Sequence, residues 1–156
     1  MHNKKFIFLF LSIIIILLLY SLAYSNSSKI ETGVVTNVVD GDTIDVKLTD
    51  TNTIERVRIL YIDTFETKHT NKAKAQAYDC NLPLEEVVIR GQKAKEYTAK
   101  LLLGKKIGLV FSDKLDKYNR NLARVIYKNE NNKLEILDET YDKSLRADVC
   151  VHIENQ

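Results

Sequence analysis

Short β-branched segments separated by tight turn signals fill the middle of the chain, and they constrain its fold more than any other feature. The segment 29–39 is rich in valine and isoleucine, and Asp40-Gly41-Asp42 after it is typical of a tight turn. The segment 44–48 then alternates apolar and polar residues, as a half-buried antiparallel strand does. Further segments of this kind predict strands at 53–62, 107–111 and 122–127.

A long helix is predicted after the third strand. Apolar residues recur at helical spacing between 84 and 102, Pro83 suits the first helical turn, and Gly104 is placed to end the helix at its C′ position. Gly91 lies inside this pattern, where glycine costs up to ~1 kcal/mol relative to alanine, so we interpret it as a close-packing point. A shorter second helix is indicated by Leu137, Tyr141 and Leu145.

These elements indicate a mainly β fold with helices (α+β). Five short strands with a helix after the third predict a five-stranded Greek-key barrel of the OB type, with two helices packed on it. The polar segment 67–81 shows no apolar period, and we expect it to form a mobile loop.

Residues 1–25 differ from the rest of the chain. Two lysines are followed by an apolar run over 6–20 and then by small residues, which is typical of a secretory signal peptide. The run also approaches the ~17 residues that a membrane span requires, so an uncleaved anchor is the alternative. Residues 26–32 are interpreted as a linker and 33–153 as the folded domain. We expect a secreted or extracytoplasmic protein, anchored in a membrane only if the first segment is retained.

The chain after residue 25 is electrically balanced. Lys4 and Lys5 are the only charged residues before that point, so the remainder carries 21 basic and 21 acidic side chains. A strongly basic domain that binds nucleic acid through its bulk charge is therefore not indicated. Any attraction for nucleic acid must be local.

The chain contains two cysteines, Cys80 and Cys150. An even count in an exported protein favours a disulfide between them, and closing so long a loop would stabilise the domain by ~4 kcal/mol. The alternative is a pair of small, unbonded hydrophobic side chains. A zinc site is not indicated, because His69 and His152 show no ligand spacing with the cysteines.

Two acidic clusters and two arginines point to chemistry on a phosphodiester. The clusters are Asp40-Gly41-Asp42-Thr43 and Asp63-Thr64-Phe65-Glu66; Arg58 precedes the second, and Arg120 ends Asp116-Lys117-Tyr118-Asn119-Arg120. Carboxylates bind a hard cation, a spare carboxylate can accept a proton, and guanidinium forks grip phosphate oxygens. The pattern predicts a metal-assisted attack on a phosphodiester bond.

One geometric requirement follows from this prediction. Strict alternation along a strand would place Arg58 and Asp63 on opposite faces. They can meet at one site only if the chain bends, so we predict a bend or bulge between Leu60 and Ile62.

These three segments, in this order and approximate spacing, resemble the signature segments of the staphylococcal nuclease (thermonuclease) family. The likeness extends from about residue 33 to residue 127. It implies an OB-fold, Ca²⁺-dependent nuclease that acts on DNA and RNA, cleaves the P–O5′ bond and leaves 3′-phosphate ends. We expect a monomer without a protein partner.

The resemblance also implies a role for each site residue. Ca²⁺ would be held by Asp42, Asp63 and the Thr64 carbonyl, with support from Asp40. Glu66 would be the general base, while Arg58 and Arg120 would bind the scissile phosphate. Lys117 and Tyr118 would contact the phosphate of a nucleotide.

Departures from the family pattern bear on activity. The family usually has proline where this chain has Phe65, so we expect a looser turn around Thr64 and Glu66 and a lower activity. The region 149–151 carries none of the family's nucleotide-contacting tyrosines. The alternative functions are a non-catalytic OB module that binds nucleic acid or protein, and a calcium-binding protein without a substrate.

Several single residues admit a simpler interpretation. Arg120 would then only pair with Asp116 in a turn, and Tyr118 would cover the barrel instead of stacking on a base. The polar segment carries Lys68, His69, Lys72 and Lys74, which form either a solvated loop or a local attraction for phosphate.

Overall fold

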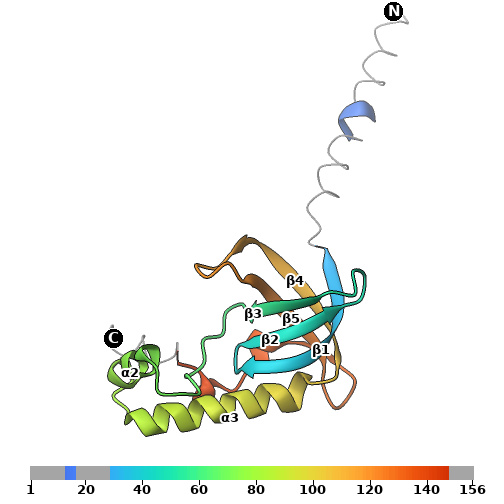
Figure 1. Cartoon of the computed structure of the whole chain (residues 1–156). Coiled ribbons are helices and arrows are strands. Elements are labelled where there is room, and N and C mark those ends of the chain that lie inside the picture. The colour runs from blue at the N-terminus through green and yellow to red at the C-terminus, as the bar shows by residue number, and fades with distance from the viewer. Residues whose placement is uncertain (1–12, 17–28, 148–156) are drawn as a thin grey trace, which may run out of the picture.

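Six strands form one sheet in the computed structural model, which describes residues 13–16 and 29–147 of the 156-residue chain. The strands are β1 (Ile30–Asp40), β2 (Thr43–Leu48), β3 (Ile54–Ile59), β4 (Lys106–Leu115), β5 (Asn121–Lys128) and β6 (Leu134–Ile136). Their order is β3-β2-β1-β4-β5-β6, and a parallel pairing of β3 with β5 closes the first five into a barrel (Figure 1). The predicted OB-type barrel is confirmed, and β6 is an additional short strand on β5.

The predicted long helix is α3 (Leu84–Leu102), which lies along one end of the barrel and packs against β1 (Figure 1). Gly104 follows it with φ +74°, so the predicted helix end is confirmed. Pro83, expected in the first turn, instead precedes the helix with ψ 143°, and its carbonyl accepts the first helical hydrogen bond from the Val87 amide.

The expected loop over 67–81 contains a helix, α2 (Asn71–Asp79), so that prediction was wrong. Thr70 caps it by accepting a hydrogen bond of 3.0 Å from the Ala73 amide. Only Ala73 and Gln76 are buried on its inner face, and such a short face gives no periodic apolar signal. α2 packs against α3.

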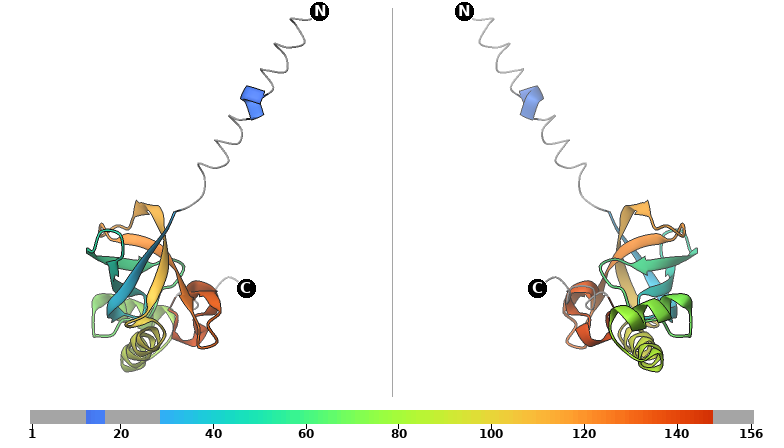
Figure 2. Two further views of the ribbon diagram at one scale, coloured as in Figure 1. Left: turned by 90° about the vertical axis from the view of Figure 1, so that its right-hand side faces the viewer. Right: turned by 90° about the vertical axis from the view of Figure 1, so that its left-hand side faces the viewer.

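The predicted second helix is divided in two. α4 (Leu137–Thr140) ends where Tyr141 adopts an extended ψ of 135°, and a 3-10 helix, η1 (Lys143–Leu145), follows. Leu137, Tyr141 and Leu145 all join the barrel core, so the apolar spacing was correct although the helix is not continuous. Figure 2 shows this orange-to-red segment beside the barrel, next to α3.

Several expectations fall on residues that the structure does not describe. Most of the expected signal peptide and Cys150 lie outside the described ranges, so both predictions stay open. β1 begins at Ile30, ahead of the expected domain start at Gly33. Among the described residues, no helix is both long and apolar enough to cross a membrane.

Candidate active site

Strand register brings the two acidic clusters and the two arginines together. In the β2–β3 ladder, Thr43 lies opposite Arg58, which places Asp42 beside that arginine. In the parallel β3–β5 ladder, Arg58 lies opposite Leu122, so the turn that carries Arg120 is also close. Three segments distant in sequence therefore meet around β3.

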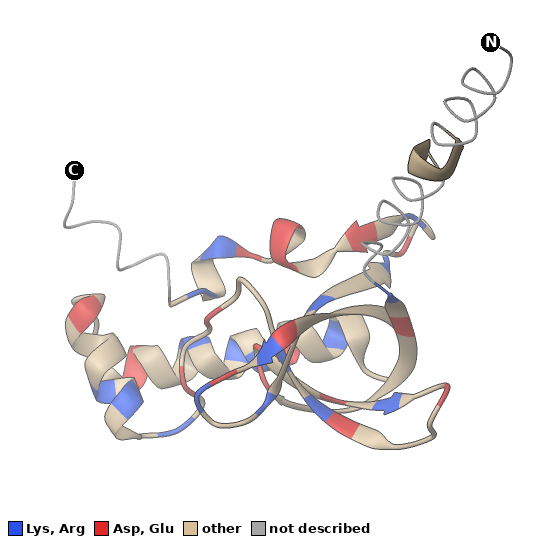
Figure 3. Cartoon of the chain, turned by 90° about the horizontal axis from the view of Figure 1, so that it is seen from above, with Lys and Arg blue, Asp and Glu red and all other residues tan. Residues whose placement is uncertain are grey.

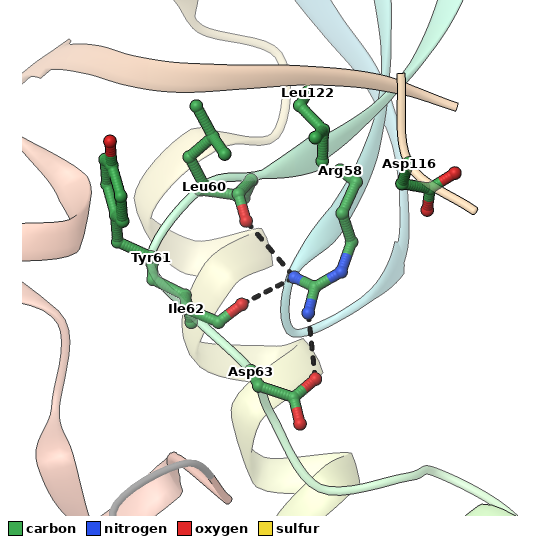
Figure 4. A pocket seen from close by; sticks show the side chains of 8 residues that line it. Arg58, Leu60, Tyr61, Ile62, Asp63, Asp116 and Leu122 are labelled. Atoms are coloured by element: carbon green, nitrogen blue, oxygen red, sulfur yellow. Dashed lines mark hydrogen bonds and ion pairs between the residues drawn. The ribbon is translucent and has the colours of Figure 1, made fainter. Parts of the chain in front are cut away.

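The predicted bend between Leu60 and Ile62 is confirmed. β3 ends at Ile59, and Tyr61 adopts φ +61°. The bend wraps around the Arg58 guanidinium, whose Nη1 donates to the Ile62 carbonyl at 2.6 Å and to the Ile59 carbonyl at 3.2 Å (Figure 4). Its Nη2 donates to Asp63 Oδ1 at 2.8 Å, so Arg58 and Asp63 do meet at one site.

Asp42 is the most buried acid of the site. Its residue is 4% exposed, its Oδ2 lies 3.0 Å from Arg58 Nη1, and Oδ2 also accepts a 2.9 Å hydrogen bond from the Thr64 amide. Burial raises the pKa of Asp42 to about 6; Arg58 opposes the rise and the charge of Asp40 adds to it. Asp42 therefore keeps its proton to a higher pH than a solvated carboxyl group does.

Lys72 of α2 links the other two carboxylates. Its Nζ lies 3.1 Å from Asp63 Oδ1 and 3.0 Å from Glu66 Oε1. Burial lowers the pKa of Lys72, but Asp63 and Glu66 more than offset this and hold it above its usual value. On sequence grounds Lys72 is only a basic neighbour of the site, because α2 was not foreseen.

Gln76, also on α2, fixes the turn that carries Thr64 and Glu66. Its Nε2 donates to the Thr64 carbonyl at 3.0 Å, and its Oε1 accepts from the Glu66 amide at 2.9 Å. The same amide side chain therefore orients a predicted metal ligand and the predicted base. Gln76 carries no signal of this role in the sequence, since its partners are backbone groups of another segment.

α3 packs against both acidic turns. A β-carbon at Gly91 would overlap the Glu66 carbonyl oxygen, so the helix backbone lies very close to that turn. Further along, Thr98 Oγ1 donates to the Gly41 carbonyl at 2.6 Å, and the Tyr141 hydroxyl donates to the same carbonyl at 3.1 Å. The interpretation of Gly91 as a close-packing point is confirmed.

Phe65 occupies the place where the family usually has proline, and it is 1% exposed. It forms a small second core with Ala73, Val87 and Ala147, and the Arg90 guanidinium carbon lies 5.8 Å from its ring centroid. A fully buried aromatic ring anchors the turn through its side chain. The expected loosening is therefore opposed by packing and by the Gln76 hydrogen bonds.

Asp116 organises the turn between β4 and β5. Its Oδ1 accepts from the Tyr118 and Arg120 amides at 2.8 Å each, and its Oδ2 accepts from Arg120 Nε at 2.6 Å. Tyr118 is 67% exposed and lies between Lys117 and Arg120, whose cations are 5.1 and 5.4 Å from its ring centroid. Both expected nucleotide contacts thus stand on the surface beside Arg120.

A hollow of about 310 Å³ lies between Arg58 and Asp116, with Asp63, Tyr61 and Leu122 among its lining residues (Figure 4). Within residues 29–147, no acceptor engages the Nε–H of Arg58 or the second hydrogen of its Nη2. Arg120 keeps both of its Nη groups similarly unengaged in the described part of the chain. Both arginines retain donors that can bind an anion.

The acidic residues suit a hard cation by donor type. Asp40, Asp42 and Asp63 supply carboxylate oxygens and Thr64 a carbonyl oxygen, and Ca²⁺ takes oxygen ligands only. Burial raises the pKa of Asp42, and a bound cation would favour the deprotonated form of this carboxyl. In the described ranges, no three acidic, histidine or cysteine side chains already form a ready metal cluster.

Comparison with known proteins agrees with this geometry. The family described as "Staphylococcal nuclease homologue" matches residues 56–147, which include most of β3, the bend, α2, α3 and the Arg120 turn. The "Uncharacterized protein MJ1439" of Methanocaldococcus jannaschii is 32% identical over 113 residues, which cover 69% of this chain and 54% of that protein. The chain therefore spans about half the length of that relative.

Proposed function

The chain belongs to the family of staphylococcal nuclease homologues, and on that premise we propose that it is a Ca²⁺-dependent nuclease. Its substrates are the phosphodiester bonds of DNA and RNA, and its products carry 3′-phosphate ends. The protein is exported, acts as a monomer, and pairs Cys80 with Cys150 in a disulfide.

One observation supports this proposal most strongly. Arg58 is fixed by Asp42 and Asp63 on one side, yet it keeps its Nε–H and one Nη2 hydrogen without an acceptor in the described residues. These donors belong to a side chain that lines the hollow opposite Asp116. An arginine held rigidly with spare donors in a hollow is suited to bind a phosphate and its transition state.

Arg120 is the second phosphate ligand in this proposal. Asp116 takes only its Nε–H, at 2.6 Å, so the salt bridge and phosphate binding are compatible. The pairing that the sequence offered as a simpler interpretation is present, and it orients the arginine. Lys117 and Tyr118 on the same turn contact the adjoining nucleotide.

Glu66 takes the proton of the attacking water. Its carboxylate is 29% exposed and lies next to Asp63 through Lys72, so water reaches it while its position is constrained. A carboxylate held this way serves as a general base when a substrate phosphate is bound nearby. Asp42, Asp63 and the Thr64 carbonyl, supported by Asp40, would hold Ca²⁺, which supplies Lewis-acid polarisation of the phosphate when bound.

The test is digestion of supercoiled plasmid DNA and of RNA by the purified protein, first with Ca²⁺ and then with EGTA. We expect nicking and degradation that require Ca²⁺, with 3′-phosphate ends on the products. A folded protein that binds nucleic acid in Ca²⁺ without cleaving it would replace the nuclease with a non-catalytic OB module.

A further inference from the structure

Tyr61 stands out because it is a large aromatic residue on a strained bend. Its φ is +61°, a region that bulky residues rarely adopt, and it is 66% exposed. Burial of the ring therefore does not explain why an aromatic residue occupies this position. Backbone strain of this kind persists when surrounding contacts fix the segment, and it is often found beside functional sites.

The bend that presents Tyr61 is the same bend that holds Arg58. Arg58 donates to the carbonyls of Ile59 and Ile62, which flank the bend on its two sides. The Leu60 amide donates to the Ala123 carbonyl of β5 at 2.9 Å, and Arg146 Nη2 donates to the Tyr61 carbonyl at 2.8 Å. The backbone of Tyr61 is thus held in a fixed relation to the guanidinium of Arg58.

Arg124 of β5 lies over one side of the Tyr61 ring, with its guanidinium carbon 5.5 Å from the ring centroid. Asp138 accepts two hydrogen bonds from Arg124, at 2.8 and 3.2 Å, and Glu139 accepts a third at 2.9 Å. Two carboxylates therefore neutralise this arginine and fix its plane. It supports the ring and is poorly placed to bind phosphate.

Two hollows meet at this bend, and both are lined by Leu60 and Tyr61. The first is the hollow of Arg58 and Asp116, and the second, of about 460 Å³, extends to Phe111 and Ser112. The second hollow is lined by two basic and two acidic side chains, Lys29, Arg124, Glu31 and Asp113. It offers aromatic surface without net positive charge, which suits a nucleobase better than a phosphate.

We propose that Tyr61 is a stacking platform for the nucleobase next to the phosphate that Arg58 binds, and that the second hollow receives this base. The proposal rests on the proposed nuclease function and adds a base-contacting residue to it. A base reaches such a platform only when it is unpaired. The stack therefore forms on unpaired bases, and single-stranded oligonucleotides are the probe for it.

The test uses the full chain carrying Glu66→Gln, in Ca²⁺, and short single-stranded oligonucleotides that contain 2-aminopurine. The chain has no tryptophan, so quenching of the 2-aminopurine fluorescence reports base stacking without interference. Tyr61→Ala should weaken single-strand binding by about 5- to 150-fold, the equivalent of the ~1–3 kcal/mol of one base–aromatic stack, and abolish the quenching. Tyr61→Phe should retain both.

Tyr78→Ala is the matched control, because Tyr78 is 88% exposed on α2 and lines neither hollow. It should bind the oligonucleotides as the parent protein does. The affinity for blunt, closed duplexes should fall by less than about twofold on Tyr61→Ala. Stacking on Tyr61 requires an unpaired base, and such duplexes offer none.

The platform and the nuclease function fail in different ways. If Tyr61→Ala, with Glu66 intact, cleaves plasmid in Ca²⁺ and binds single strands with unchanged affinity and quenching, the platform is wrong and the nuclease stands. Equal losses of affinity for single strands and closed duplexes on Tyr61→Ala would show that Tyr61 does not act by base stacking, and would overturn the platform. If the unmodified chain neither binds nor cleaves nucleic acid, the nuclease function fails and the platform fails with it.

Discussion

The carbonyl oxygen of Glu66 lies directly against Gly91 of α3, at a spot where even a β-carbon would overlap it. The helix therefore fixes the position of the turn that carries the proposed general base. On the same helix, Thr98 holds the Gly41 carbonyl of the first acidic turn at 2.6 Å. One helix thus positions both acidic clusters relative to each other.

Gly91→Ala tests this arrangement. Alanine would gain up to ~1 kcal/mol in helix propensity, but overlap with a backbone carbonyl costs ~1–3 kcal/mol because backbone cannot rotate away as a side chain does. We expect a net loss of stability in urea unfolding, and a larger loss of cleavage rate as Glu66 moves.

Gly104→Ala is the control for this substitution. Gly104 has φ +74°, and a β-carbon added there would meet no atom within 4 Å, so alanine should cost ~1 kcal/mol in backbone strain alone. Its cleavage rate should match that of the parent. A Gly91→Ala protein as stable and as active as the parent would contradict the positioning role of α3.

Arg120→Ala should separate activity from stability. The Arg120–Asp116 pair is partly exposed on the arginine side, at 31%, and exposed ion pairs contribute little, so its loss should change the free energy of unfolding only slightly. Cleavage should fall by about 10²- to 10³-fold, as when one donor to a developing charge is removed.

Arg58→Ala should instead damage both properties. It leaves Asp42, whose side chain is 6% exposed, without its cation, and breaking such buried pairs costs ~3–5 kcal/mol. Urea unfolding and single-turnover cleavage measure the two effects. Equal loss of stability in the Arg58 and Arg120 variants would contradict the assigned contacts.

Lys72→Met should tighten Ca²⁺ binding. Lys72 forms ion pairs with Asp63 and Glu66 at 3.1 and 3.0 Å, and its positive charge would repel a cation bound beside them. Removing it should improve the calorimetric dissociation constant for Ca²⁺ by about fivefold, the equivalent of ~1 kcal/mol for a half-exposed pair.

Lys74→Met serves as the comparison, since Lys74 is exposed on the same helix and forms no ion pair within the described residues. It should leave the Ca²⁺ affinity unchanged. Weaker Ca²⁺ binding in Lys72→Met would show that the lysine supports the metal site.

The raised pKa of Asp42 predicts an unusual pH dependence of the free energy of unfolding in EGTA. Its pKa rises from 3.8 to about 6 on folding, so between these values the folded state keeps a proton that the unfolded state releases. Its contribution to the unfolding free energy is therefore present below pH 3.8, falls as the pH rises to about 6, and is constant above that.

Urea unfolding across this range and up to neutral pH measures the slope. Asp42→Asn should remove the contribution, and saturating Ca²⁺ should reverse its sign, because the cation binds the deprotonated carboxylate. Identical pH profiles of stability for the parent and Asp42→Asn would refute the contribution of Asp42.

Local sequence signals were sufficient for the barrel and for the bend. Alternation and turn residues predicted β2, and the conflict between strand alternation and a shared site for Arg58 and Asp63 predicted the bend between Leu60 and Ile62. The balanced charge of the domain also agrees with Figure 3, where acidic and basic residues intersperse along the elements.

The elements and site residues that local sequence signals did not predict depend on tertiary contacts. α2 buries only Ala73 and Gln76, so its helix is stabilised by the Thr70 cap and by the turn it supports, neither of which gives a periodic pattern. Gln76 and Lys72 acquire their roles only once α2 lies beside the Thr64–Glu66 turn. Strand β6 has three residues, too few for alternation to stand out.

The most direct test of the proposed chemistry is single-turnover cleavage of an end-labelled oligonucleotide in saturating Ca²⁺, comparing the parent with Glu66→Gln. We expect binding within about twofold and cleavage slower by ~10²- to 10⁴-fold, the usual contribution of a general base. Cleavage by Glu66→Gln at the parent rate would contradict the proposed chemistry and remove Glu66 from the mechanism.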